Sequence, residues 1–453
     1  MVELTRAPSR TPFHPRRSAL RADPFWSGMW RTGSIGDWYS ADDFRALRDA
    51  GLVKSPAWLS MSVEDAAERV LLPRNRETIL RVLAALDQWR TMTVEQVEAL
   101  TDTPKIAHGN ASIISVMWNA GLIEICELGA TFKQGDRHRE GLLIRPTKPG
   151  ALLREFEKTL SYAEWVSATA GLGFDADRQF ARHNVLATDL GLRTAELANV
   201  GCVLGEKLSS MAMLAYSGVG ADVPTSGVAN GSDLTLVRPD GLRIAVEVTA
   251  SISGGWFYEK VEKLVRVLHR RPLAQTGLCV LFVVAPRRDA ASTEPREILR
   301  KVKRDVQKAV LSYPGTATDP TSARVAVTSW PDLFPSATEV ADDFRYLPVE
   351  RPTGPGYIGD PNAENVWERT QMLNPDAVPF TPDDPAAMTA VMENASGLRG
   401  VPHMLRGKVR PVLSDIVLER FGLPELVQVD GTKPVTEARG AAGAAGIPAR
   451  LAY

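Results

Sequence analysis

The run Leu278–Val284, LCVLFVV, constrains the fold more than any other stretch of the chain. Seven successive apolar residues with several branched side chains are typical of a strand that is covered on both faces. Such a strand needs helices above and below it, so the run predicts the central strand of an α/β sheet. Helices are predicted before and after it, in WFYEKVEKLVRVLHR and REILRKVKRDVQKAVL.

A strand–turn–strand pattern lies upstream of this run, in SDLTLVRPDGLRIAVEVTAS from Ser232 to Ser251. Two apolar, β-branched runs flank a Pro-Asp-Gly turn, which predicts a hairpin. A helix is expected before it, in HNVLATDLGLRTAELANV, and a last strand in RVAVTSW. Residues 180–335 are therefore predicted to form a mixed domain in the order α-β-β-α-β-α-β.

Two carboxylates in this hairpin need an explanation. Asp233 opens the first run, and Glu247 lies inside a strand that is otherwise apolar. A buried carboxylate is costly unless it is paired or bound to a metal. A salt bridge or an exposed edge strand would explain Glu247 simply; the alternative is a metal-dependent nuclease site.

Residues 75–160 show a different order. Helices are predicted in NRETILRVLAALDQWR, in TVEQVEALT with Thr93 at its start, and in ASIISVMWNAGL with Gly121 at its end. Two strand-like runs follow, LIEICEL and EGLLIRPT. Three short helices and a hairpin are the order of a winged helix, a variant of the helix-turn-helix.

A winged helix predicts two kinds of DNA contact. The third helix has a polar face for the bases, formed by Ser112, Ser115 and Asn119. The loop between the strands would be the wing, with basic residues for phosphates: Lys133, Arg137, His138 and Arg139. The third helix is poor in Arg and Lys, and the module would alternatively serve as a protein–protein or linker domain.

Composition limits the classes of function. The formal net charge of −1 gives no global attraction to nucleic acid, so DNA binding needs local basic patches. The helix at residues 296–304 is a candidate phosphate-contacting patch; the alternative is a solvated helix face. Three cysteines have no zinc-ligand spacing and are expected to be core thiols in a reducing compartment. No apolar run is long enough to span a bilayer, so the protein is expected to be cytoplasmic. Neither a P-loop nor GxSxG is present.

Three further segments complete the predicted organisation. Residues 1–23 are rich in arginine and proline and are expected to be a flexible basic arm, followed by a helical segment at 24–74. Residues 346–453 are expected to be an irregular, partly helical region, through which the chain would form homo-oligomers or bind protein partners.

The domain at 180–335 resembles the PD-(D/E)xK nuclease fold. That resemblance implies that Asp233 and Glu247 hold a divalent ion, Mg²⁺, which prefers carboxylate oxygens and activates water for phosphodiester cleavage. The family pattern places lysine where this chain has Thr249. Lys260, on the apolar arc of the next helix, is the candidate for a migrated lysine, or else it only extends its charged end to solvent.

Glu196 in the preceding helix is a candidate third carboxylate; the alternative is that it lies on a solvated helix face. More broadly, residues 75–335 resemble actinobacterial replication-relaxation proteins, on the stretches RHNVLATDLGLRTAEL, VEVT, the lysine-containing helix and VLFVVAP. This resemblance implies DNA transactions of plasmids or integrated elements. Three hypotheses follow: a Mg²⁺-dependent endonuclease or nickase, a DNA-binding or scaffold protein with an inactive nuclease fold, and a structural or partner-binding protein.

Overall fold

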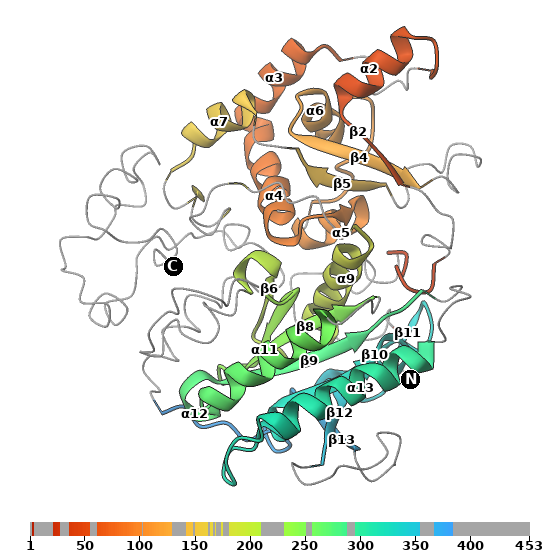
Figure 1. The fold of residues 1–453 in the computed structure, drawn as a ribbon. Helices are drawn as coiled ribbons and strands as arrows, with labels where there is room; N and C mark the ends of the chain where they lie inside the picture. Colours follow the sequence, from red (N-terminus) through yellow and green to blue (C-terminus); the bar gives the residue numbers. More distant parts are fainter. Residues whose placement is uncertain are drawn as a thin grey trace, which may run out of the picture. The chain divides into compact units, whose positions relative to one another are not determined.

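The computed structural model describes much of the chain, in two compact units that are each considered separately (Figure 1). The first comprises residues 1–32 and 186–400, and the second residues 33–185 and 401–453. The described residues are 2–3, 21–27, 36–54, 61–101, 103–128, 142–147, 150–161, 164–165, 168, 174, 181–209, 231–250, 256–287, 295–353 and 367–383.

The second unit contains a four-stranded antiparallel sheet in the order β2-β4-β5-β3. Its strands are β2 (Gly36–Tyr39), β3 (Met92–Thr93), β4 (Ile123–Leu128) and β5 (Leu143–Pro146). Its helices are α2 (Ala41–Asp49), α3 (Val63–Leu71), α4 (Pro73–Trp89), α5 (Val94–Thr101), α6 (Ile113–Asn119) and α7 (Ala151–Lys158).

The predicted hairpin of this unit is confirmed, because Ile123 pairs with Pro146 and Cys126 with Leu143. The predicted start of the second helix is also confirmed: Gln96 N donates to Thr93 Oγ1 over 3.2 Å, and Thr93 N donates to Gln96 Oε1 over 3.1 Å. These reciprocal bonds form a capping box, which satisfies two donors at the helix start.

The segment at 24–74 was predicted to be only helical, and this is wrong for β2. Trp38 pairs with Cys126 across the sheet, and the Arg145 guanidinium lies 4.0 Å from the centre of the Trp38 ring. The strand has four residues and begins with glycine, so its local pattern is weak. Its partners lie far along the chain, and they decide its conformation.

The first unit is built on a seven-stranded mixed sheet in the order β13-β12-β10-β9-β8-β7-β6. Strands β8, β9 and β10 are parallel, and the other pairings are antiparallel. The bounds are β6 (Cys202–Gly205), β7 (Leu234–Val237), β8 (Arg243–Thr249), β9 (Leu278–Val284), β10 (Val325–Ser329), β12 (Pro348–Pro352) and β13 (Trp367–Gln371). A separate pair joins β1 (Val2–Glu3) to β11 (Glu339–Val340).

The helices of this unit are α11 (Trp256–Arg270), α12 (Leu273–Thr276), α13 (Pro295–Ser312) and α14 (Trp330–Leu333), with α9 (Ala181–Leu197) entering it at residue 186. Three short 3₁₀ helices are η4 (Glu206–Leu208), η5 (Thr321–Arg324) and η6 (Phe344–Tyr346).

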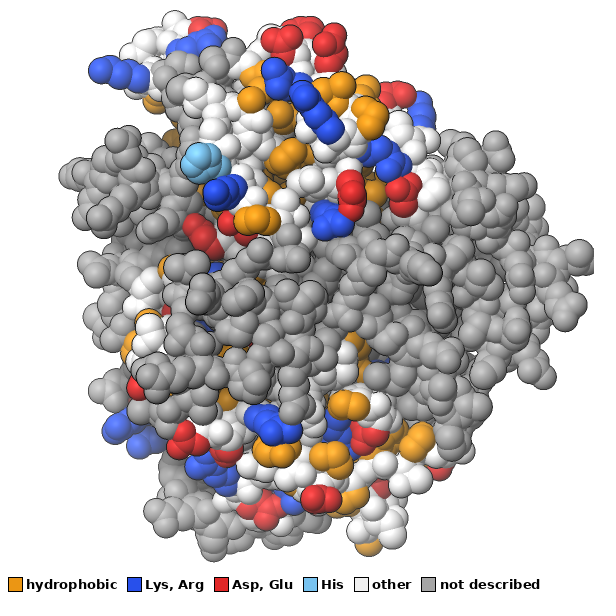
Figure 2. Space-filling view, turned by 180° about the vertical axis from the view of Figure 1, so that it is seen from behind, with side chains coloured by type: hydrophobic (Ala, Val, Ile, Leu, Met, Phe, Trp, Pro, Cys, Tyr) orange, Lys and Arg blue, Asp and Glu red, His pale blue; other side chains and the backbone are white. Residues whose placement is uncertain are grey.

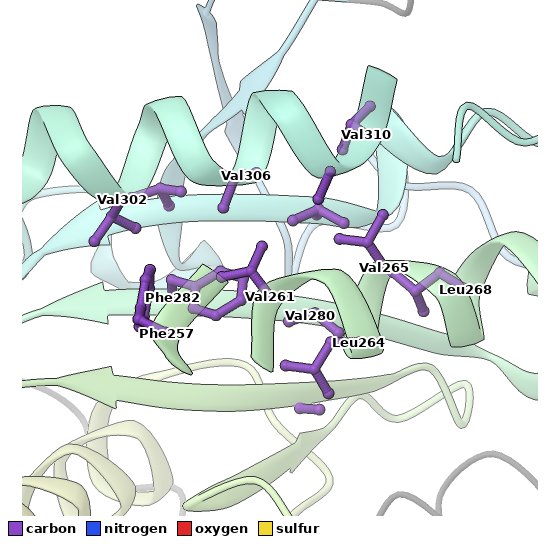
Figure 3. Packing of buried hydrophobic residues seen from close by; sticks show 14 of the residues in the cluster. Phe257, Val261, Leu264, Val265, Leu268, Val280, Phe282, Val302, Val306 and Val310 are labelled. Carbon is purple, nitrogen blue, oxygen red and sulfur yellow. The ribbon is translucent and has the colours of Figure 1, made fainter. Parts of the chain in front are cut away.

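The core of the sheet confirms the prediction for its central strand, since every position of β9 is buried. Figure 3 shows side chains of α11 and α13, among them Val261, Val302 and Val306, lying against Val280 and Phe282 of β9. The apolar arc predicted for α11 is the buried one, with Phe257, Val261, Leu264, Val265 and Leu268 all in the core. Branched side chains on a pleated surface therefore determine this packing.

The sheet departs from the prediction at both edges. Strand β6 was not predicted, and β12 and β13 extend the sheet beyond the predicted limit at residue 335. The described part of the C-terminal region, up to residue 383, therefore contributes two strands, whereas a partly helical region was expected. Residues 384–453, including the helices predicted there, lie outside the described residues.

The end of the predicted basic arm is buried in the first unit. Arg21 donates to both oxygens of Glu196, over 2.7 and 2.9 Å, and Asp23 Oδ2 lies 2.9 Å from Arg193 Nη2. The expectation of a flexible arm is therefore wrong for Arg21 and Asp23, and also for Val2–Glu3, which pair with β11. Residues 4–20 lie outside the described residues. The partners in α9 could not be seen from the local arginine-rich pattern.

Candidate functional site

Asp233 and Glu247 meet across the hairpin of β7 and β8. Leu234 is paired with Val246, so the next step of the register sets Asp233 beside Glu247. The Asp233 backbone N–H donates to Val246 O over 3.0 Å, and the Val248 N–H donates to Asp233 Oδ2 over 2.6 Å. Both carboxylates are largely buried, with 9% exposure for Asp233 and 4% for Glu247. The hairpin therefore holds two acids at one end of β7.

Lys260 of α11 completes the cluster by forming an ion pair with Glu247 Oε2. Glu247 is two residues after Ala245 in β8, so the two side chains lie on the same face of the sheet. Ala245 belongs to the core under α11, and Glu247 therefore lies on the face that this helix covers. Lys260 reaches the sheet through this pair, whereas Lys263 is exposed; the catalytic role expected for Lys260 stays a prediction.

The charge on Lys260 is stabilised by more than one acid. Burial opposes the charged form of the side chain, but the carboxylates of Glu247 and Asp233 outweigh burial and raise the pKa of Lys260. Glu247 is in direct contact with the ammonium, whereas Asp233 acts on its charge through space. Glu247 is therefore the direct partner of Lys260, and Asp233 adds a second negative charge to its surroundings.

Glu206 is a third acid of this region, and the sequence reasoning missed it. It also raises the pKa of Lys260. Gly205 at the end of β6 pairs with Leu234, and Glu206 follows directly as the first residue of η4, so it lies at the same end of the sheet as Asp233. The signal would have been the acid directly after the apolar run CVLG, had that run been recognised as a strand.

Thr249 stands where the predicted resemblance to the nuclease fold would place a lysine. It lies two residues after Glu247, on the same face of β8, and is 6% exposed. Its backbone oxygen accepts from Ala285 N over 2.9 Å, which continues the parallel pairing with the end of β9. A neutral hydroxyl therefore occupies this position, and the positive charge comes from α11.

Glu196 is placed in a different cluster, the buried network of Arg21, Asp23, Asp189 and Arg193. Its side chain is fully buried, so the expectation of a solvated helix face is wrong. Burial raises the pKa of Glu196, although Arg21 opposes this shift. The bidentate Arg21 pair gives Glu196 a structural explanation that does not involve Lys260.

The polar residues predicted to face DNA on α6 have structural partners. Ser115 and Asn119 are each 1% exposed. Asn119 Oδ1 accepts from Arg45 over 2.9 Å, and Asn119 Nδ2 donates to Ser115 O over 2.8 Å. Ser112 caps the helix by accepting from Ser115 N over 3.2 Å. Neither Ser115 nor Asn119 is therefore open to a DNA base.

The predicted wing lies outside the described residues, because these end at 128 and resume at 142. Its residues Lys133, Arg137, His138 and Arg139 are therefore not placed. The strands that would carry the wing are paired as predicted.

The two acids and the lysine fit a divalent ion in part. Carboxylate oxygens are the ligands that Mg²⁺ prefers, and it is commonly held by only one or two of them while keeping several waters. Within the described ranges, no group of three or more His, Cys, Asp or Glu side chains is arranged to hold a metal. Glu206 is therefore near the pair but not a third ligand in this geometry.

Other predictions on single residues have clear outcomes. Cys126, Cys202 and Cys279 are all buried, as expected of core thiols. Burial raises the pKa of Cys279 to about 11, so its thiol stays protonated at neutral pH. None of the helices in the described part of the chain combines the length and the apolar character needed to cross a bilayer.

Comparison with known proteins returned no match: no protein-family model, curated protein or solved structure is significantly similar to this chain.

Proposed function

We propose that this chain is a DNA-binding protein with a metal-dependent phosphodiester-cleaving site at Asp233, Glu247 and Lys260. One observation carries the proposal: Glu247, largely buried in β8, pairs with a lysine from the covering helix, and a second largely buried carboxylate, Asp233, precedes the adjoining strand β7. Burying three charged groups together is costly in a purely structural role, where apolar residues would often serve as well. Perturbed ionisable groups of this kind are concentrated at functional sites.

The order of elements around the cluster supports a nuclease-like domain. An antiparallel β6-β7-β8 meander leads to α11 and then to the parallel strand β9. This is the arrangement in which the family resemblance places Asp233 and Glu247 as ligands of Mg²⁺. A bound Mg²⁺ would supply an activated water and stabilise charge on the phosphodiester.

The role of Lys260 follows from its charge. Its raised pKa keeps the ammonium positive across the neutral range. Placed beside the carboxylates, a fixed positive charge can stabilise the negative charge that develops on phosphoryl oxygens during hydrolysis. Thr249 cannot do so, because its hydroxyl is neutral. Lys260 therefore takes the part that the family pattern gives to the lysine at that position.

The second unit would position the protein on DNA. Its three helices α4, α5 and α6, followed by the β4-β5 hairpin, support a winged-helix interpretation. With Ser115 and Asn119 buried, phosphate contacts from the basic loop would contribute more of the affinity than base contacts from α6. The resemblance to replication-relaxation proteins suggests a setting in plasmid or mobile-element replication or transfer.

A second candidate is a nuclease fold that has lost catalysis and serves as a DNA-binding scaffold. The ion pair itself favours this candidate, because Lys260 already neutralises the carboxylate of Glu247. A divalent ion would have to compete with the ammonium for that oxygen. The two candidates share the fold and the DNA-binding role and differ only in cleavage.

Cleavage assays separate the candidates. The full chain is incubated with supercoiled plasmid, duplex and single-stranded oligonucleotides, with Mg²⁺ or Mn²⁺ or with EDTA. The proposal expects metal-dependent nicks or cuts that are lost in Glu247→Gln and Asp233→Asn and reduced in Lys260→Met. Glu339→Gln, a partly buried acid of β11, is the control and should cleave like the wild type. DNA binding with no cleavage under either metal would favour the scaffold.

A further inference from the structure

Helix α13 carries a stripe of basic residues along its exposed side. Arg296, Arg300, Arg304 and Lys308 follow each other at intervals of four residues, and all four are exposed. On a helix, residues four apart lie one above the other on one face. The opposite face holds Val302, Val306 and Val310 in the core (Figure 3). The stripe therefore lies on the solvent side of a firmly packed helix.

Like charges four residues apart destabilise a helix, so four basic residues at this spacing call for a functional explanation. Among the described residues, Arg296 and Arg300 form no ion pair, and Arg304 is 4.0 Å from Asp305. Helix α11 instead has opposite charges at this spacing: Glu262 pairs with Arg266, four residues later, over 2.7 Å. On the face drawn in Figure 2, acidic and basic side chains are likewise interspersed. A single-sign stripe instead fits a polyanionic partner.

The last residue of the stripe contacts the first turn of α11. Lys308 Nζ lies 4.3 Å from the centre of the Tyr258 ring, in the first turn of α11. Two residues later on the same helix, Lys260 pairs with Glu247. Residues two apart point to nearly opposite sides of a helix, so Tyr258 and Lys260 face different ways. A strand bound to the stripe would therefore cross the first turn of α11 to reach the carboxylates.

An exposed aromatic side chain lies at the same end of α11. Trp256 is 53% exposed, which is unusual for so large an apolar side chain. Its ring meets the edge of Phe257 at a centroid distance of 6.5 Å, and Phe257 in turn packs on Phe282 at 6.0 Å. The indole is therefore supported by the core, while much of it faces solvent. Trp256 is also one helical turn from Lys260.

We propose that the α13 stripe binds the phosphates of a single-stranded nucleic acid and that Trp256 stacks on one of its bases next to the carboxylates. This inference rests on the proposed function and names its substrate as unpaired rather than duplex. The stripe covers about 18 Å of helix, at 1.5 Å per residue. Basic grooves with aromatic platforms are how proteins hold unpaired bases without sequence preference.

Binding measured without metal tests the inference. The full chain is titrated in EDTA with a fluorescein-labelled oligothymidylate of about 20 nucleotides and with a duplex of equal length, at several salt concentrations. The variant Arg300→Gln/Arg304→Gln should weaken single-strand binding and lower the slope of log K against log salt by about 1.4, or about 0.7 per arginine. Arg270→Gln, an exposed arginine at the other end of α11, is the matched control and should leave the slope unchanged.

Trp256 is tested by two substitutions. Trp256→Ala should weaken binding of the single strand roughly ten-fold, leave duplex binding unchanged and keep the salt slope of the wild type. Trp256→Phe should restore part of the loss, because a smaller ring still stacks.

Two results would overturn the inference: a salt slope unaffected by the double arginine variant, or an equal loss on duplex and single strand in Trp256→Ala. Because EDTA excludes metal-dependent cleavage, these outcomes are independent of whether the carboxylate site is catalytic. A chain that binds as expected and never cleaves would contradict only the proposed function.

Discussion

Lys260 of α11 and Glu247 of β8 form an ion pair in which the carboxylate is buried and the ammonium is three-quarters covered, with side-chain exposures of 5% and 24%. The pair joins the helix to the sheet at the point where Asp233 also approaches. Its energetics can be tested independently of any catalytic role.

Lys260→Met should destabilise the first unit by about 1–3 kcal/mol, because it leaves a charged acceptor buried without its cation. Adding Glu247→Gln should recover part of the loss, since the amide carries no charge. Urea unfolding of the wild type, both single variants and the double variant gives the coupling free energy between Lys260 and Glu247. Additive effects would mean that the pair does not interact as the structure has it.

The same pair predicts a pH dependence with a defined sign. The pKa of Lys260 is raised on folding, so the charged side chain stabilises the folded state. This contribution to the free energy of unfolding is fully present below the pKa of lysine in the unfolded chain, about 10.4. It is lost as the pH rises through the folded pKa. The stability difference between wild type and Lys260→Met should thus be constant from pH 7 to 9 and shrink only above about pH 10. A difference that vanished by pH 8 would contradict the raised pKa.

The buried Arg21–Glu196 pair gives a second stability prediction. Arg21→Met should cost about 3–5 kcal/mol, because it leaves Glu196 buried and charged. Arg243→Met is a matched control: Arg243 is equally buried, but among the described residues it has no carboxylate partner, only the Thr276 backbone oxygen. Its loss should cost clearly less. If both variants lose the same free energy of unfolding in chemical denaturation, the ion pair of Arg21 with Glu196 contributes no additional stability.

This network also responds to pH. Burial raises the pKa of Glu196 in the folded state, so the folded protein binds the proton more tightly than the unfolded chain. Stability therefore falls as pH rises from the unfolded pKa, about 4.3, through the folded value. Without Arg21 the folded pKa should rise further, so Arg21→Met should be markedly more stable at pH 5 than at pH 8. A flat profile in this variant would contradict the assignment.

Asn119 distinguishes a structural from a DNA-contacting role for α6. Asn119→Ala removes hydrogen bonds to Arg45 and the Ser115 backbone and should cost about 1–3 kcal/mol. Its DNA affinity, measured well below the unfolding transition, should match the wild type. Ser112→Ala, which removes only the helix cap, should cost about 1 kcal/mol. A specific loss of DNA affinity in a fully stable Asn119→Ala would restore the groove-facing role.

The predictable parts of the fold were those with strong local patterns. The apolar run of β9, the Pro-Asp-Gly turn between β7 and β8, and the buried arc of α11 were all recognisable, because periodicity and turn chemistry are local. From the arc alone, Lys260 could be chosen over Lys263.

The remaining features depend on partners distant in sequence. Strand β6 is four residues long, and Glu206 was missed with it. Glu196 is buried because Arg21, 175 residues away, reaches it. Asn119 is buried because Arg45 of α2 covers it. For Glu196 and Asn119, the sequence alone suggested exposure to solvent or to a ligand. Each is instead bonded by an arginine from a distant segment, and no local sequence pattern predicts such a partner.

The central claim is that Asp233 and Glu247 can share a divalent ion. The most direct measurement is Mn²⁺ binding by electron paramagnetic resonance, with Mn²⁺ standing in for Mg²⁺. The wild type should bind one ion saturably, Glu247→Gln and Asp233→Asn should lose this site, and Lys260→Met should bind more tightly because the competing ammonium of Lys260 is gone. Mn²⁺ binding that is no stronger in the wild type and Lys260→Met than in Glu247→Gln would contradict the claim.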